Sequence, residues 1–569
     1  MQVQRARAEI SARSWATDSG LWLVLVLTAA IYAPTLVHAA FLSDDISILG
    51  LVEGWDRQGG LWSNALALFF SRLPSGNYFY RPLPFLGFAL DWAWFGAAAR
   101  GWHLLNLVAH LLSTALVYGL AKCLLRTEGD RQVPTAVLAA LLFALSPAGP
   151  EVVIWIAGRF DAMATAALLA CLYCLCRSRN GRDRWAMLSW FAAILGVLSK
   201  ESAAVVFPIA CIFALWKTSQ RHPFGSGAFL RELAQLCIPF VCLAALYFAA
   251  RWTAFGSAWR VYEANIARDH FDPELVLRTG VLWFTAVFPE TWGRRLLLVL
   301  LLLVALLGGY RMRLNTRLLR AWLVVAAALF VSLVLVLPHK SSLSATGEEG
   351  RFFYAGAAFL ALLLALPTAA LRGAGQRLRV PTLVVGYGVV TLTAIALGQA
   401  VQHWVVASQN ARSLLPALAQ AAEQLPPNAY ALVVIPDHIG PVPFGRNAQG
   451  GLVAPPLQRV PLSTRLVPLL AVDAGRWYEW IRGGIVPRLR SLPLADVERS
   501  PLALHPAPIV APSEFLPTHY SCWRSDTRQL VSLQGIEVAN MSSWLDSWRR
   551  SLRAAGCDDL VEEIRLRVG

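Results

Sequence analysis

The stretch "GLWLVLVLTAAIYAPTLVHAAFLSDD" (residues 20–45) is a long apolar run that ends at two adjacent aspartates, Asp44 and Asp45. A run of about 20 apolar residues is long enough to cross the roughly 30 Å hydrocarbon core of a bilayer as a helix. We therefore expect a first membrane span at about residues 20–40. A carboxylate at the edge of a membrane must be solvated, paired or functional, so the aspartate pair is a candidate site.

Apolar runs of this kind recur throughout the chain of 569 residues, of which 56% are hydrophobic and only 15% are charged. This composition is typical of a polytopic membrane protein and not of a soluble protein of the same length. The formal net charge is +15, but the arginines occur in short blocks between the apolar runs. Such blocks follow the positive-inside rule, so the basic charge indicates topology, and we expect no nucleic-acid partner.

The apolar runs and the arginine blocks together predict an α-helical membrane protein with about eleven spans and a cytoplasmic N-terminus. After the first span, the others are expected at 102–125, 134–147, 162–176, 185–198, 203–217, 233–250, 296–310, 321–337, 352–371 and 381–401. The arginine blocks 177–184, 311–320 and 371–379 then all face the cytoplasm. This divides the chain into a membrane domain, residues 1–401, and an outer domain, residues 402–569.

Two segments between the spans are too polar to cross the membrane and too apolar to be free loops. Residues 41–101 are mixed, aromatic and glycine-rich, and we expect interfacial amphipathic helices there. The stretch "LVLRTGVLWFTAVFP" (275–289) is the second segment. We place it in the interface too, because a span there would move the arginine block 311–320 to the outside.

The outer domain, residues 402–569, is less apolar and rich in proline, and we expect a small mixed α/β fold. The stretch "AYALVVIPDHIG" (429–440) predicts a buried strand that ends in a turn. We prefer that turn to a second active site at Asp437 and His438. The stretch "SSWLDSWRRSLRAAG" (542–556) predicts an amphipathic helix with a serine cap and a glycine stop.

Under this topology, the ionisable residues outside the arginine blocks gather at the outer ends of the spans. Charges at this depth are costly to bury and are usually paired or functional, so we treat these as candidate site residues. They are Asp44, Asp45, Arg81, Glu151, Arg159, Asp161, Lys200, Glu201, Glu348, Glu349 and Arg351.

Simpler roles remain open for several of these residues. The aspartate pair can be a solvated helix end, and Lys200 and Glu201 can mark only a tight outer turn. Arg81 can snorkel to the interface. Glu151 and Arg159 would lie two turns apart on one face of a helix and can form a structural pair.

Six motifs occur in one order along the chain and together resemble a known family: "FLSDD", "YRPL", "GWHLLNLVAHLL", "FALSPAGPEVVIWIAGRFDAMA", "LSKESA" and "EEGRFFYAGAAFL". The set resembles the polytopic glycosyltransferases of the GT-C class. It is most similar to the protein O-mannosyltransferases, including the transmembrane and tetratricopeptide-repeat enzymes and their bacterial relatives. The resemblance covers roughly residues 20–370. The tail departs from the family because it shows no 34-residue helical repeat, which leaves the acceptor open.

The resemblance implies a sugar donor carried on a polyprenyl phosphate, which is used at the outer face of the membrane. In that family an acidic residue just after the first span acts as the catalytic base or binds the acceptor, which here means Asp44 or Asp45. The residues agree with this role, because glycosyl transfer to a hydroxyl needs a base in hydrogen-bond reach of the attacking oxygen. Of the two, we favour Asp45. A single displacement would invert the anomeric centre.

The departing phosphate needs positive charge, and an arginine fork matches its oxygens. Arg351 is the first choice for this contact, followed by Lys200 and Arg81. The remaining acidic and basic candidates would position the donor or the acceptor: Glu151, Arg159, Asp161, Glu201 and Glu349. The family's usual "HPVHxE" is replaced by "SPAGPE" at this loop, and no Asp-x-Asp stands at the site, so we predict no required metal and no other cofactor.

Two functions outside the enzyme class compete with this interpretation: a transporter or flippase of a lipid-linked sugar, and a non-enzymatic assembly factor. Transporters tend to show duplicated halves and midplane charges, whereas here the charges lie at span ends. Within the enzyme class, the acceptor can be a protein, a lipid such as lipid A, or a glycan. We expect a bacterial inner membrane with the outer domain in the periplasm, where Cys522 and Cys557 can form a disulfide.

Overall fold

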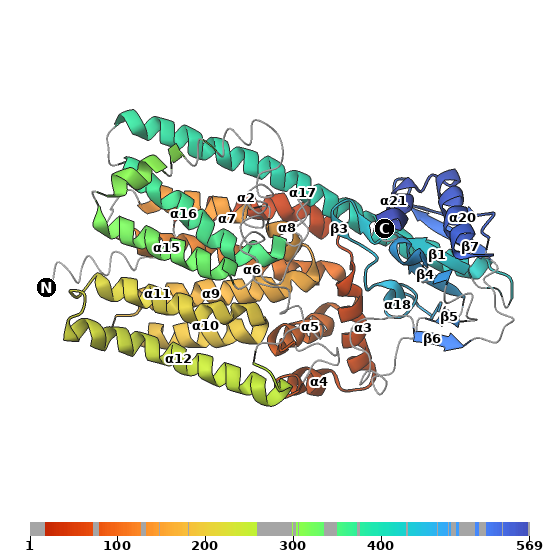
Figure 1. Ribbon diagram of the computed structural model, residues 1–569, viewed down its shortest axis with the longest axis horizontal. Coiled ribbons are helices and arrows are strands. Elements are labelled where there is room, and N and C mark those ends of the chain that lie inside the picture. Colours follow the sequence, from red (N-terminus) through yellow and green to blue (C-terminus); the bar gives the residue numbers. More distant parts are fainter. Residues whose placement is uncertain are drawn as a thin grey trace.

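The computed structural model shows a bundle of long helices with a smaller α/β domain at one end (Figure 1). The structure describes residues 18–566 apart from a few single positions and the segments 72–78, 127–131, most of 259–314, 335–349, 373–375 and most of 479–518. The expected interfacial stretch 275–289 and the candidate residues Glu348 and Glu349 lie outside the described residues.

Among the described helices, eight are long and apolar enough to cross a membrane. They contain α2 (Ser19–Val37), α6 (Ala99–Leu124), α9 (Arg159–Arg177), α11 (Val206–Ser219), α12 (Gly227–Phe255), α15 (Thr316–Val334), α16 (Tyr354–Arg372) and α17 (Gln376–Gln424). Two shorter apolar helices lie between them in the chain, α7 (Gln132–Ala144) and α10 (Arg184–Ser199). Together these helices account for every expected span except 296–310, of which the structure describes only separate helical pieces.

Helices α9 and α10 form a hairpin with an arginine block at one end and two candidate site residues at the other. The connection at 177–184 carries an arginine block, whereas Asp161 and Lys200 lie at the other end of the hairpin. The two helices are in contact at Gly196, where an added Cβ would lie at an ordinary van der Waals distance of 3.5 Å from the Cβ of Ala167. Small residues allow this approach, because a membrane bundle is stabilised by close packing rather than by the hydrophobic effect.

The helices expected within residues 41–101 are present as α3 (Asp44–Arg57), α4 (Leu61–Ala67) and α5 (Pro82–Phe95). They lie at the end of the bundle nearest the outer domain, and α3 runs across the direction of the long helices (Figure 1). Pro82 begins α5 because its fixed φ suits the first helical position. Gly96 ends it with a φ of 52°, which a residue without a Cβ adopts easily.

The outer domain contains a four-stranded sheet in the order β4-β1-β7-β8. The central strand β1 (Ala431–Ile435) is parallel to β4 (Leu466–Leu470) and to β7 (His519–Arg524), and β8 (Gln529–Leu533) is antiparallel to β7. Every residue of β1 is buried, as its continuous apolar run predicts for a parallel strand. The small α/β domain expected from the sequence is therefore confirmed.

Shorter elements complete this domain. They are β2 (His438–Ile439), β3 (Val442–Pro443), α18 (Gln449–Leu452), β5 (Ile485–Arg488), β6 (Ala507–Val510), α20 (Met541–Ala554) and α21 (Asp558–Leu566). Helix α20 is the expected amphipathic helix, but the serine cap was wrong. Its N-cap is Asn540, whose side chain accepts the N–H of Ser543 at 2.8 Å, while the Ser543 hydroxyl accepts the N–H of Asn540. The glycine stop is confirmed, since Gly556 follows the helix with a φ of 72°.

Helix α17 connects the two parts of the molecule. Its 49 residues pass through position 401 without a break and extend from the bundle to the outer domain (Figure 1). At about 1.5 Å per residue, such a helix is roughly 73 Å long. The indole N–H of Trp523 in β7 donates to Asn410 Oδ1 on α17 at 3.0 Å. A disulfide joins Cys522 and Cys557, as the sequence suggested for an oxidising compartment.

Candidate active site

Asp45 lies in the first turn of α3 and is buried, with a side chain that accepts two backbone N–H groups. Its Oδ1 accepts from Ala157 at 2.8 Å, and its Oδ2 accepts from Leu42 at 3.2 Å. Burial raises the pKa of Asp45 well above its usual range, and the adjacent charge of Asp44 adds to this, against the backbone hydrogen bonds. The carboxyl group therefore holds the backbone after the first span against the turn that contains Ala157.

Asp44 is the more accessible member of the pair and has a different partner. Its Oδ1 accepts a hydrogen bond from Nδ2 of Asn447, in the outer domain, at 2.7 Å. Adjacent helical residues point about 100° apart, which explains why the two carboxylates reach different parts of the molecule. The residue before them, Ser43, is buried and has a φ of 50°. A serine in this region of φ is strained, and such strain persists where the surrounding structure holds it.

Arg81 lies just before α5 and pairs with Glu201, which follows α10. Its Nη2 and Nε both contact Glu201 Oε2, at 2.8 and 2.9 Å. The other carboxylate oxygen, Oε1, accepts the backbone N–H of Tyr80 at 2.8 Å. The guanidinium also lies over the rings of Phe79 and Phe160. Arg81 is therefore fixed at this end of the bundle by charge and by ring contacts.

Lys200 pairs with Asp161 across the α9–α10 hairpin. Its Nζ lies 2.6 and 2.7 Å from the two carboxylate oxygens of Asp161. Burial lowers the pKa of the Lys200 ammonium; Asp161 opposes this effect, and the positive charges of Arg81 and Arg351 add to it. Lys200 is therefore influenced by cations from two other segments, and it shares the Phe352 ring with Arg351.

Arg351 lies in the 3-10 turn Gly350–Phe353 and pairs with Glu151 of the short helix α8 (Gly149–Val153). Its Nη1 contacts Glu151 Oε1 at 3.0 Å, and its backbone N–H donates to Oε2 at 3.0 Å. The guanidinium lies 4.5 Å from the centre of the Trp155 ring. The Trp155 indole N–H in turn donates to the carbonyl of Leu42 at 3.3 Å. Trp155 thus connects the arginine with the segment that carries the aspartate pair.

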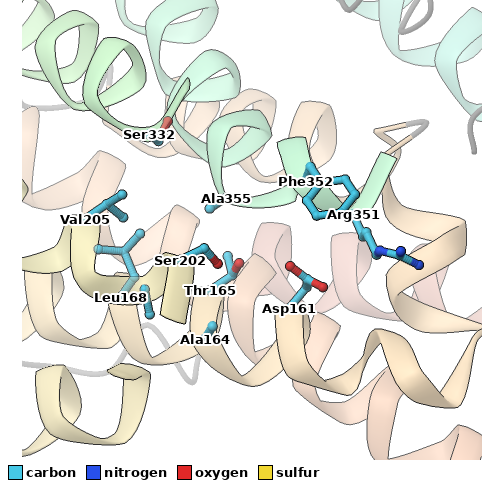
Figure 2. Close-up of a pocket in the computed structure, with 11 residues that line it drawn as sticks. Asp161, Ala164, Thr165, Leu168, Ser202, Val205, Ser332, Arg351, Phe352 and Ala355 are labelled. Atoms are coloured by element: carbon cyan, nitrogen blue, oxygen red, sulfur yellow. The ribbon is translucent and has the colours of Figure 1, made fainter. Parts of the chain in front are cut away.

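A small cavity opens beside the Lys200–Asp161 and Arg351–Glu151 pairs. Figure 2 shows Asp161, Phe352 and Arg351 at one end and Leu168 and Val205 at the other. The lining comprises Asp161, Ala164, Thr165, Leu168, Ser202, Ala203, Val205, Ser332, Arg351, Phe352 and Ala355. The lining thus places one acidic and one basic side chain at one end and aliphatic side chains at the other.

The structure gives Arg159 a different set of contacts from those that its spacing suggested. Its Nη1 forms an ion pair with Asp91, its Nε donates to Asn106 Oδ1 at 2.8 Å, and its Nη2 donates to the Trp102 carbonyl at 2.8 Å. The structural pair of Arg159 with Glu151 is not formed, because α8 ends at Val153 and a 3-10 turn intervenes before α9. Arg159 fastens α9 to α5 and α6 instead.

Sequence reasoning missed four residues that the structure places at or around the site: Asp91, Asn106, Trp155 and Asn447. Asp91 carried a signal, since it is a carboxylate in an apolar helix, "PLPFLGFALDWAWF". Asn447 carried none, because it lies in the tail, 403 positions from Asp44. Within the described part of the chain, no group of three or more His, Cys, Asp or Glu side chains is arranged to hold a metal ion.

Comparison with known proteins gives one family match. Residues 82–247 match the family described as dolichyl-phosphate-mannose-protein mannosyltransferase. This segment runs from the start of α5 into α12 and carries Glu151, Asp161, Lys200 and Glu201. The resemblance to protein O-mannosyltransferases that the sequence motifs indicated is therefore confirmed.

Similar curated proteins point the same way. The chain is 32% identical over 146 residues to protein O-mannosyl-transferase F38B6.6 of Caenorhabditis elegans, covering 26% of this chain and 20% of that protein. It is 31% identical over 201 residues to protein O-mannosyl-transferase Tmtc2 of Drosophila melanogaster, covering 33% and 20%. The match thus spans about a fifth of the length of these relatives. Among solved structures, ArnT from Cupriavidus metallidurans bound to undecaprenyl phosphate aligns with 84% of this chain and 97% of its own, at 12% identity and a TM-score of 0.45.

Proposed function

We propose that this protein is an inverting glycosyltransferase that moves a sugar from a polyprenyl-phosphate donor to a hydroxyl acceptor at the outer face of the membrane. One observation carries the proposal: Arg351 and Asp161, the partner of Lys200, line one end of a cavity whose other end is lined by Leu168 and Val205. The family match over residues 82–247 supports the reaction class, and its description supports a hexose such as mannose as the sugar.

The donor would bind with its phosphate among the cations and its isoprenoid chain against the apolar lining. Arg351 has the most exposed side chain of the three, at 24%, against 13% for Arg81 and 9% for Lys200. Its planar fork can donate two parallel hydrogen bonds to phosphate oxygens. Lys200 and Arg81 add positive charge where negative charge develops on the leaving group.

We assign the catalytic base to Asp44 rather than to Asp45, which the sequence alone favoured. Both oxygens of Asp45 already accept backbone N–H groups, and its side chain is buried. Asp44 is more accessible and has one amide partner. In the proposed step, Asp44 takes the proton of the acceptor hydroxyl while that oxygen bonds to the anomeric carbon. The bond from this carbon to the phosphate oxygen breaks on the opposite face, and the phosphate leaves with both bonding electrons.

The proposed location is a bacterial inner membrane with the outer domain in the periplasm. The disulfide between Cys522 and Cys557 supports an oxidising compartment for that domain. The arginine block at 177–184 lies at the opposite end of the α9–α10 hairpin from Lys200, which supports a cytoplasmic position for that end. The acceptor class remains open among protein, lipid and glycan.

The test uses purified protein in nanodiscs with a set of radiolabelled polyprenyl-phosphate sugars. We expect label to move to water or to an added acceptor, and Asp44→Asn to lower kcat by about 100- to 10,000-fold while donor binding persists. Glu53→Gln, on the same helix, is the matched control and should retain wild-type turnover.

Two results would contradict the proposal in different ways. Donor binding without turnover for every sugar would favour the flippase interpretation. Alternatively, Asp44→Asn could retain full turnover while Asp45→Asn loses turnover at normal thermal stability. That result would support the glycosyltransferase function and assign the catalytic base to Asp45.

A further inference from the structure

The outer domain contacts the aspartate-bearing helix α3 through the loop at residues 444–447 and through α18, which follows it. The N–H of Ser43 donates to the carbonyl of Phe444 at 3.0 Å, and the Ser47 hydroxyl donates to the carbonyl of Asn447 at 2.6 Å. Between these two contacts, Asn447 Nδ2 donates to Asp44 Oδ1 at 2.7 Å. Each hydrogen bond joins the segment that begins α3 to residues 444–447, about 400 positions later in the chain.

The backbone of this loop is fixed independently of α3. Arg446 Nη2 and His438 Nδ1 both contact Asp437 Oδ2, at 2.7 and 2.9 Å. The Asp437 carbonyl accepts the N–H of Phe444 at 2.8 Å, and Glu563 accepts the N–H of Asp437. Asp437 and His438 therefore serve to hold the loop, and the turn expected at "PDHIG" is a turn with a structural charge cluster.

Asn447 itself has a conformation that suits its position. Its φ is 58°, in the left-handed region, which asparagine tolerates better than most residues. The next helix, α18, packs closely on α3, because an added Cβ at Gly451 would lie only 2.3 Å from Ile46 Cγ2. The approach of the outer domain to α3 is thus close enough to fix the Asn447 amide against Asp44.

From these contacts we propose that Asn447 is a positioning residue for Asp44, so that the outer domain completes the active site of the membrane domain. The inference rests on the proposed function and names a residue that the family match, which covers 82–247, does not reach. An amide suits this task because it donates to a carboxylate without adding charge and without taking the proton itself. The second oxygen of Asp44 then remains for the acceptor hydroxyl.

The experiment compares three variants of the full-length protein in nanodiscs. Asn447→Gly removes the amide and keeps the left-handed backbone. Asn447→Asp keeps the shape and exchanges the donor for a negative charge. Ser47→Ala removes the neighbouring hydrogen bond between the same two segments and leaves the amide in place, so it reports on domain docking alone.

We expect Asn447→Gly to lower kcat about 10- to 100-fold with little change in the donor KM, because hydrogen bonds to charged groups are of this strength. The acidic limb of its pH–rate profile should move to higher pH, since the base loses a donor that favours its charged form. Asn447→Asp should move that limb further, because like charges repel. Ser47→Ala should stay within about twofold of wild type.

The outcomes separate the inference from the function on which it rests. Wild-type turnover that depends on Asp44, combined with unchanged kcat and pH profile in both Asn447 variants, overturns the positioning role alone. Equal losses in Ser47→Ala and Asn447→Gly, with unshifted pH profiles, also overturn it and leave only domain docking. No turnover by the wild-type protein with any donor overturns the proposed function and the inference with it.

Discussion

At the scale of single residues, each of the three candidate cations is paired with a carboxylate from a different segment. Arg81 pairs with Glu201, and the two remaining pairs are Lys200–Asp161 and Arg351–Glu151. Such pairs offset part of the cost of burying charge and fix the donors before a ligand binds. A phosphate that reaches this end of the cavity would therefore meet oriented donors, with little reorganisation of the protein.

The phosphate contact of Arg351 gives the first prediction at this scale. Arg351→Gln should raise the donor KM by about 10- to 100-fold, the usual strength of a hydrogen bond to a charged group. The donor KM of Arg351→Lys should lie between those of the wild type and Arg351→Gln, because lysine keeps the charge and lacks the planar fork. The measurement is the donor dependence of turnover, with exposed Arg57→Gln on α3 as the control. An unchanged donor KM in Arg351→Gln would remove this residue from the phosphate site.

Arg159 gives a second prediction, which separates a structural role from a binding role. Its guanidinium and its partner Asp91 are both almost fully buried. Arg159→Gln should lower the free energy of unfolding by about 3–5 kcal/mol, because Asp91 would stay buried without its counter-charge. Thermal unfolding in nanodiscs measures this, and the double variant with Asp91→Asn should recover part of the loss. Normal stability with lost donor binding would instead support the role in positioning the donor or the acceptor that the family resemblance implied for Arg159.

The sequence could identify the aspartate pair but not the different tasks of its members. Two carboxylates after an apolar run stand out because a membrane rarely tolerates them without a purpose. Ala157, the partner of Asp45, lies 112 positions away, and Asn447, the partner of Asp44, lies 403 positions away. The adjacency of the two aspartates in the sequence also does not show which side chain is buried. Arg351 was likewise found from its charge, whereas its pairing with Glu151 depends on where the 3-10 turns place both residues.

At the scale of elements, the loop between β1 and α18 determines how the outer domain meets α3. It begins at Asp437 and ends at Asn447, and it is fastened at its base by Glu563 of α21. The sequence predicted the strand and the turn here, because a continuous apolar run followed by proline and glycine is distinctive. It could not predict that the loop reaches α3, because that contact depends on the direction of α17.

The loop should respond to pH through Glu563. Burial raises the pKa of Glu563 to about 7, against hydrogen bonds from the N–H groups of Asp437 and His438. The folded domain then holds a proton that the unfolded chain releases near its ordinary value of 4.5. The resulting stability is fully present below that value and is lost as pH rises to about 7. In contrast, hydrogen bonds from His438 and Arg446 outweigh burial and hold the pKa of Asp437 at about 2.

We therefore expect the melting temperature of the outer domain to fall between about pH 5 and pH 8 in the wild-type protein. Glu563→Gln should flatten this dependence, because it removes the titrating group and keeps a side chain of the same size. Tryptophan fluorescence can follow the transition, since Trp477, Trp523, Trp544 and Trp548 are buried in this domain. The control is Glu562→Gln, at the exposed neighbouring residue. If the melting temperature fell equally with pH in the wild type and in Glu563→Gln, Glu563 would not be the titrating group.

At the scale of the whole molecule, the two ends of the bundle carry different chemistry. The pairs Arg81–Glu201, Lys200–Asp161 and Arg351–Glu151, the cavity and the outer domain lie at one end, and the arginine block at 177–184 lies at the other. Apolar run lengths and arginine positions are enough to predict this separation, because both follow from membrane thickness and the positive-inside rule. The sequence predicted α8 and the 3-10 turn Ile156–Gly158 less well, because these short turns depend on contacts with Asp45 and Asn106 rather than on local pattern.

The sidedness of the molecule gives the last prediction. If the outer domain is periplasmic, Cys522 and Cys557 should resist a maleimide on intact cells and react only after a membrane-impermeant reductant is added. The assay needs a background in which the cysteines of the membrane domain are replaced by serine. Replacing Cys557 by serine should also lower the free energy of unfolding of this domain by about 2–4 kcal/mol, because the disulfide closes a loop of moderate length. Thiols that react only in permeabilised cells, without reductant, would place this domain in the cytoplasm. That result would move the aspartate pair and the cations to the inner face, where an outward-facing acceptor could not reach them.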